Sequence, residues 1–232
     1  MKRYLPFIII GGVLLALIGG GALMLSSNQA NQASLPAPTT PSSTPLSASS
    51  PSATLPVQPS TAVPKTTVTI DEYGDYQCPP CGGLHPVIKS LKAEFGNKLK
   101  LNFYQLPLTG LHKNALVAAH AAVAAKQQGR FWEMHNKLYE TQNVWSEFAD
   151  IHQIVIAYAG ELGMDAAMFK RDLDSRTVAA LVQADMQRAA SLKIDSTPTL
   201  LIEGQPFPNE KLSPENLRIV MNRFLTGRAA TP

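Results

Sequence analysis

The chain of 232 residues contains only two cysteines, Cys78 and Cys81. A zinc site needs four ligands, and because no second cysteine pair exists, His85 could add one ligand at most. Covalent haem attachment needs a histidine directly after the second cysteine, where this chain has Gly82. A purely structural disulfide would close so short a loop that it would stabilise the fold poorly. The composition therefore argues against a structural role for the pair.

Charged side chains are missing between Arg3 and Lys65. Within this stretch, residues 5–25 form an apolar run, and roughly 20 such residues cross about 30 Å of hydrocarbon. Positive residues at 1–4 favour a cytoplasmic N-terminus and an extracytoplasmic body. A cleaved signal peptide, whose apolar core is usually about 7–15 residues long, would instead give a secreted protein. We predict an uncleaved, single-pass transmembrane anchor at residues 5–25, with secretion as the alternative.

Large apolar side chains are almost absent from residues 26–64, which consist mainly of Ser, Thr, Ala, Pro, Gln and Asn. Such a segment cannot bury enough surface to fold, so it predicts a disordered linker. Residues 65–232 then have the size of one domain. Without Lys2 and Arg3, the 20 basic residues of the chain become 18, against 17 acidic residues. This balance gives no indication of nucleic-acid binding.

Residues 67–72 alternate apolar and polar side chains, and residues 99–105 repeat the pattern, which predicts two strands joined by a helix over 78–95. Pro79 suits the first helical turn, whereas Pro86 predicts a kink or local break. Helical patterns follow at residues 112–128, 131–141, 151–159, 164–169 and 177–192.

A strand composition returns at residues 199–203. Gly204 and Gln205 are expected to form a hairpin turn into Pro206 and Phe207. Ser213 and Pro214 then predict the start of a final helix, with the serine as N-cap.

The spacing Cys78-Pro79-Pro80-Cys81, directly after a strand, is typical of dithiol–disulfide redox chemistry. If the pair opens a helix, the first sulfur lies over unpaired backbone N–H groups and the positive end of the helix dipole, which favour the thiolate. The second cysteine lies one turn away and can release a mixed disulfide. We therefore expect Cys78 to be the nucleophile.

The segment from Glu72 to Cys81, the sequence Ser196-Thr197-Pro198-Thr199 and the helical patterns between them resemble the DsbA-like branch of the thioredoxin-fold superfamily. The resemblance covers about residues 66–226. It implies an α/β thioredoxin fold, in which helices flank a central mixed β-sheet, with an inserted all-helical subdomain at about residues 110–193.

The resemblance also implies roles for individual residues. Cys78 would be exposed to substrate, and Cys81 would be the buried resolving cysteine. Thr197 and Pro198 would form a cis-proline loop that faces the disulfide and binds an extended substrate through its backbone. An ordinary trans-proline at the entry to a strand is the alternative.

Glu72 matches the family's buried acidic residue beneath the active site. Burial would raise the pKa of this carboxyl group and let it take the proton from Cys81 during resolution. A solvated carboxylate at the end of a strand is the alternative. Asp75 and Tyr76 also match the family's pattern, without an assigned chemical role.

The chain departs from strongly oxidising members of the family at Pro80, where they carry histidine. Proline cannot stabilise the neighbouring thiolate and has no N–H to direct at the sulfur. Pro79 and Pro80 are thus expected to tune the redox pair. We predict a Cys78 pKa below the reference of about 8.5 but well above the roughly 3.5 of DsbA.

These features predict an extracytoplasmic thiol:disulfide oxidoreductase that introduces disulfides into exported proteins. The resemblance implies reoxidation by a membrane quinone-coupled thiol oxidase. A disulfide reductase or isomerase supplied with electrons across the membrane is the alternative, and a redox-inert peptide-binding chaperone module is a third. We expect a monomer that needs no metal or other cofactor.

Overall fold

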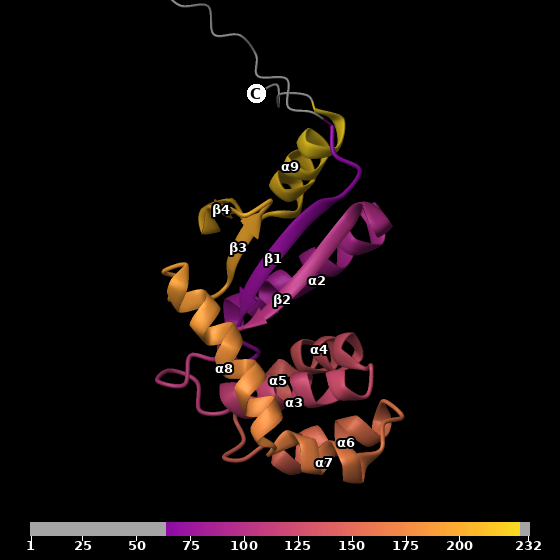
Figure 1. Cartoon of the computed structure of the whole chain (residues 1–232), viewed down its shortest axis with the longest axis vertical. Helices are drawn as coiled ribbons and strands as arrows, with labels where there is room; N and C mark the ends of the chain where they lie inside the picture. The colour runs from indigo at the N-terminus through magenta and orange to yellow at the C-terminus, as the bar shows by residue number, and fades with distance from the viewer. Residues whose placement is uncertain (1–63, 228–232) are drawn as a thin grey trace, which may run out of the picture. The chain divides into compact units, whose positions relative to one another are not determined.

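The computed structural model describes residues 64–227, and Figure 1 shows their arrangement. Strand β1 (Val68–Gly74) pairs in parallel with β2 (Leu99–Gln105) and antiparallel with β3 (Thr199–Ile202). Strand β4 (Gln205–Phe207) pairs antiparallel with β3, so that the strand order is β2-β1-β3-β4. This is the mixed sheet that the sequence predicts.

The predicted membrane anchor at residues 5–25, and the linker at 26–64 up to residue 63, lie outside the described residues. Within residues 64–227, none of the helices combines the length and apolar character that crossing a membrane requires.

Alternation along the strands gives the sheet two apolar faces. Val68 and Ile70 of β1 pack with helix α2 (Pro79–Phe95) and helix α9 (Pro214–Thr226) in one buried cluster. Tyr73 of the same strand packs on the other side with Ala189 of helix α8 (Arg176–Ser191). Helices therefore cover both faces of the sheet, as the thioredoxin fold requires.

The segment between β2 and β3 is helical, as predicted. Its helices are α3 (Ala115–Gln127), α4 (Phe131–Glu140), α5 (Gln142–Trp145), α6 (His152–Glu161), α7 (Ala166–Leu173) and α8 (Arg176–Ser191). They enclose a second core in which α3 contributes a run of buried alanines, so that neighbouring helices approach its backbone closely. Short 3₁₀ turns, η1 (Gly96–Lys98) and η2 (Asn209–Lys211), complete the domain.

Two local predictions need correction. The local break at Pro86 does not occur, and helix α2 runs on through the proline, because Leu84, Ile88 and Leu91 are buried on both sides of it and hold the two halves in one core. The β3–β4 turn consists of Glu203 and Gly204 rather than Gly204 and Gln205, since Ile202 pairs directly with Gln205.

Glu203 takes the left-handed conformation of this turn, with φ of 53°, which side-chain-bearing residues rarely adopt. Its carboxylate accepts a hydrogen bond of 2.7 Å from the backbone N–H of Thr69 and pairs with Lys65. These contacts hold Glu203 in place, and glycine is needed only at the second turn position, where Gly204 has φ of 76°.

Candidate active site

Cys78 is the N-cap residue of helix α2, with extended backbone angles of φ −71° and ψ 119°. Its N–H donates to the carbonyl oxygen of Asp75 at 3.1 Å, and its own carbonyl accepts from the N–H of Gly82 at 3.1 Å. Pro79 occupies the first turn, as predicted, where its missing N–H costs no hydrogen bond. The cysteine thus stands at the positive end of the helix.

The loop that contains Thr197 and Pro198 lies directly against this sulfur. The Thr197–Pro198 peptide bond is cis, as the sequence predicts. The Cys78 thiol donates a hydrogen bond of 3.5 Å to the carbonyl oxygen of Thr197. The fold therefore brings together the two motifs that carry the predicted chemistry.

Both cysteines are free thiols, and Cys78 is 5 % exposed while Cys81 is fully buried. The expectation that Cys78 is exposed is wrong for this reduced form. The reason is that Thr197 lies against the sulfur and Gln142 reaches over the backbone, where its Nε2 donates to the carbonyl of Cys78 at 2.9 Å. Gly82 leaves room for this amide, because a Cβ there would lie 2.4 Å from its Oε1.

The two thiols have opposite acidities. The hydrogen bond from the Cys81 thiol, followed by a contribution from Thr197, lowers the pKa of Cys78 to about 6 against the opposing effect of burial. The pKa of Cys81 is raised, chiefly because its proton is shared with the Cys78 sulfur and because it is buried. At neutral pH the pair therefore holds one thiolate, on Cys78. This value agrees with the range expected from the sequence.

Glu72 is 1 % exposed, and burial raises its pKa to about 8. Its Oε1 finds no hydrogen-bond partner among the described residues. Burial, followed by the charges that Cys81 and Glu72 carry when ionised, raises the pKa of the neighbouring Tyr139. The structure thus favours the buried carboxyl group over the solvated alternative.

Asp75 is a site residue whose role the sequence does not reveal. Its fully buried carboxylate accepts hydrogen bonds from the N–H groups of Gln77 at 2.7 Å and Leu108 at 2.9 Å, and lies 2.8 Å from Nδ1 of His112. Since its carbonyl accepts from Cys78, Asp75 fixes the loop that enters the helix. Leu108 and His112 come from a distant segment, so a sequence motif gives no sign of these two contacts.

A groove of about 420 Å³ borders the cysteine loop and the cis-proline. It is lined by Pro80, Gly83, Leu84, Thr197, Pro198, Asn209 and Leu212. The groove therefore lies beside the segment that carries Cys78, although Cys78 itself does not line it. Within residues 64–227, no cluster of three or more histidine, cysteine or acidic side chains is placed to hold a metal ion.

The sequence profile of the thioredoxin family matches residues 58–222. BdbD from Bacillus subtilis has a similar structure with a TM-score of 0.61 at 23 % identity, covering 69 % of this chain and 88 % of BdbD. A thioredoxin-like oxidoreductase from Silicibacter pomeroyi is 26 % identical, with a TM-score of 0.54, covering 67 % of this chain and 87 % of that protein. The fold is also that of DsbA proteins from Wolbachia pipientis and Xylella fastidiosa. The predicted fold and the resemblance to DsbA are confirmed.

Among curated proteins, the chain is 38 % identical over 138 residues to the Na⁺/H⁺ antiporter NhaA 1 of Salinispora arenicola. This match covers 60 % of the chain and 20 % of the antiporter. The chain thus spans about a fifth of the length of that relative.

Proposed function

The chain belongs to the thioredoxin family, and we propose that this oxidoreductase introduces disulfides into exported proteins outside the cytoplasm. The observation that carries the proposal is the placement of Cys78 at a helix N-terminus, 3.5 Å from the Thr197 carbonyl and beside an open groove. The apolar run at residues 5–25 and the positive residues before it support an extracytoplasmic domain. Ion transport does not follow from the partial match to an antiporter.

In the proposed reaction, a substrate thiolate attacks the Cys78 sulfur of the Cys78–Cys81 disulfide. The S–S bond breaks, Cys81 leaves with the electron pair, and Glu72 supplies the proton that Cys81 takes up. A second thiolate of the substrate then attacks the substrate sulfur of the mixed disulfide. The substrate disulfide forms, the bond to Cys78 breaks, and Cys78 leaves as a thiolate. The substrate loses two electrons, and the enzyme disulfide gains them and becomes the dithiol.

Two groups assist these steps. The hydrogen bond from Cys81 stabilises the departing Cys78 thiolate, which favours transfer of the disulfide to the substrate. Glu72, with a pKa of about 8, carries a proton at neutral pH and can pass it to the buried thiolate. A membrane quinone-coupled thiol oxidase would then restore the disulfide.

Disulfide reduction or isomerisation is the second candidate. It is favoured by the Cys78 pKa of about 6, which is closer to the roughly 7 of thioredoxin than to the roughly 3.5 of DsbA. A less stabilised thiolate makes the disulfide a weaker oxidant, and the flow of electrons then depends on the redox partner.

The reduction potential of the Cys78–Cys81 pair, measured by equilibration with glutathione buffers, tests the direction in which electrons flow between this protein and its substrates. A potential nearer to about −120 mV than to about −270 mV is expected for an oxidase. In parallel, the oxidised chain should restore disulfides to a reduced, unfolded protein, and Cys78→Ser should abolish this reaction. A potential near about −270 mV, together with failure to oxidise the substrate, would contradict the proposal.

A further inference from the structure

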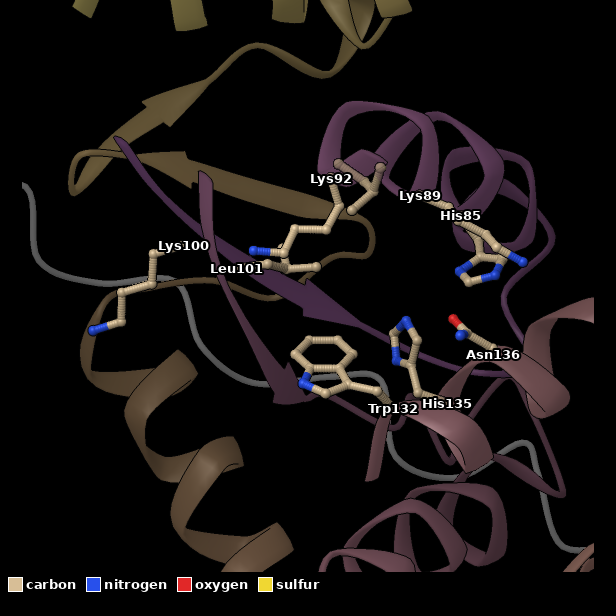
Figure 2. A pocket seen from close by; sticks show the side chains of 9 residues that line it. His85, Lys89, Lys92, Lys100, Leu101, Trp132, His135 and Asn136 are labelled. Atoms are coloured by element: carbon tan, nitrogen blue, oxygen red, sulfur yellow. The ribbon is translucent and has the colours of Figure 1, made fainter. Parts of the chain in front are cut away.

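A second cavity, of about 330 Å³, lies between helix α2, strand β2 and helix α4. It shares no lining residue with the groove beside Pro198. Figure 2 shows the side chains that surround it. Its volume falls at the lower end of the range of about 300–1,000 Å³ that is usual for small-molecule sites.

One part of this cavity is apolar and suited to a flat ring. Ile88 and Leu101 contribute aliphatic surface from α2 and β2, and Trp132 contributes its indole from α4. Trp132 is 42 % exposed, although a large aromatic side chain is ordinarily more enclosed. Figure 2 shows the indole spread below Leu101.

A hydrogen-bond donor adjoins this apolar part. The Tyr76 hydroxyl lies 3.0 Å from Nδ1 of His135. Burial lowers the pKa of His135 to about 3, so the ring is neutral. In the tautomer whose Nδ1 accepts from Tyr76, the ring hydrogen sits on Nε2, which is then a donor. His135 is 2 % exposed and belongs to the lining of the cavity.

The same end of the cavity holds a buried polar atom without a partner. His85 is 6 % exposed, and its Nε2 makes no hydrogen bond with any described residue. Its ring centroid lies 5.3 Å from that of His135, and Figure 2 shows the two imidazoles facing the same space beside Asn136. A buried polar atom of this kind costs free energy unless another group satisfies it.

The charge around the cavity is positive. Lys89, Lys92 and Lys100 line it, and no acidic side chain does so among the described lining residues. Lys89 is paired with Glu140 at 2.6 Å. Among residues 64–227, Lys92 donates to two backbone carbonyls and to no carboxylate, so its charge is not compensated there. Lys100 lies at the outer edge in Figure 2. An anion is therefore attracted to this site.

We propose that this cavity binds a small planar aromatic carboxylate. The ring lies against Trp132 and Leu101, and the carboxylate accepts a hydrogen bond from Nε2 of His135 in the positive field of Lys92 and Lys100. The site is distinct from the redox pair, and the inference does not depend on the proposed redox function.

Titration of the full chain with naphthalene-2-carboxylate, followed by the two indole N–H resonances in NMR spectra, tests the proposal. The Trp132 resonance, assigned with Trp132→Phe, should shift in a saturable way. The Trp145 resonance should not shift, because this residue is fully buried and its Nε1 donates to the carbonyl of Leu138 at 2.8 Å. Naphthalene-2-carboxamide, which lacks the charge, should bind more weakly. Equal affinities, or a Trp132 resonance that does not move, would overturn the proposal.

Variants separate the contribution of charge to binding from that of contact with the ring. Lys100→Glu should weaken carboxylate binding at least about threefold and leave carboxamide binding unchanged, because it reverses a nearby charge. The matched control Lys170→Glu, on exposed surface of α7, should change neither affinity. Trp132→Ala should weaken both ligands. Equal losses in the two lysine variants would show binding to general positive charge and reject the site.

Cys78→Ser should bind the carboxylate as the unmodified chain does. If binding fails while disulfide exchange proceeds, this inference alone is wrong. If binding persists while exchange fails, only the redox proposal is wrong.

Discussion

The Cys78 sulfur lies 3.5 Å from the carbonyl oxygen of Thr197, a residue 119 positions later in the chain. The carbonyl can accept the thiol hydrogen but cannot stabilise a thiolate. The buried hydroxyl of Thr197, however, has no hydrogen-bond partner among the described residues and is free to donate to the ionised sulfur. Thr197 can therefore form a hydrogen bond with Cys78 in both protonation states, through its carbonyl with the thiol and through its hydroxyl with the thiolate.

Thr197→Val tests this role, because it removes the hydroxyl and keeps the shape. The Cys78 pKa should rise from about 6 to roughly 7, since the thiolate loses a charge-assisted hydrogen bond. The pH dependence of alkylation of the reduced protein measures it. Thr197→Ser should keep the lower value, and a rise of the same size in this control would count against the hydroxyl.

Cys81→Ala should raise the Cys78 pKa further than any other single change in the site, because the Cys81 thiol makes the largest lowering contribution. Cys81→Ser retains an O–H donor at the same position and should keep the pKa near 6. Thiolate absorbance as a function of pH measures both variants. Indistinguishable titration curves would mean that the helix N-terminus, rather than Cys81, stabilises the thiolate.

Glu72→Gln should change how the stability of the fold depends on pH. The pKa of Glu72 is raised from 4.5 to about 8 by burial, so the folded chain keeps a proton that the unfolded chain releases. The stability that this proton contributes is complete below pH 4.5 and is lost as pH rises to about 8. The total loss is at most on the order of 5 kcal/mol.

Denaturant unfolding of the oxidised proteins from acid to mildly alkaline pH measures this difference. Oxidation removes the two thiols as titrating groups. The raised pKa of Glu72 does not depend on the thiols, because its cause is burial. Relative to the unmodified chain, Glu72→Gln should gain stability through this window. Parallel stability curves would show that Glu72 titrates normally.

The sequence predicts the parts of the fold that depend on local pattern. Alternation at Val68 and Ile70 places β1, and Ser213 with Pro214 places the start of α9, where the serine hydroxyl accepts from the N–H of Asn216. The cysteine pair and the proline at 198 indicate the chemistry because both lie in recognisable short motifs.

What the sequence does not reveal depends on contacts between distant segments. Gln142 reaches the backbone of Cys78 from 64 positions away and holds the carbonyl group of the cysteine. Helix α2 tolerates Pro86 because burial outweighs one lost hydrogen bond, and Glu203 tolerates a left-handed conformation because Thr69 holds its carboxylate. Each outcome is set by a tertiary contact that overrides a local preference.

Asp75→Asn should destabilise the fold and disturb the redox site together. The carboxylate accepts from two backbone N–H groups and lies 2.8 Å from Nδ1 of His112 at a fully buried position. An amide has one acceptor oxygen, and its NH₂ group would face N–H donors, so at least one donor loses its partner. We expect a loss of about 1–3 kcal/mol in the free energy of unfolding.

The same substitution should alter the reactivity of Cys78, because the backbone of Asp75 accepts the N–H of this cysteine at 3.1 Å and fixes the start of the helix. Asp150→Asn is the matched control: Asp150 also contacts a histidine, His152, but lies on the surface with 69 % of its side chain exposed. Denaturant unfolding and the alkylation rate of Cys78 should both change for Asp75→Asn and stay constant for the control. If Asp75→Asn lowers stability but leaves the alkylation profile unchanged, Asp75 supports the loop without setting the geometry of the sulfur.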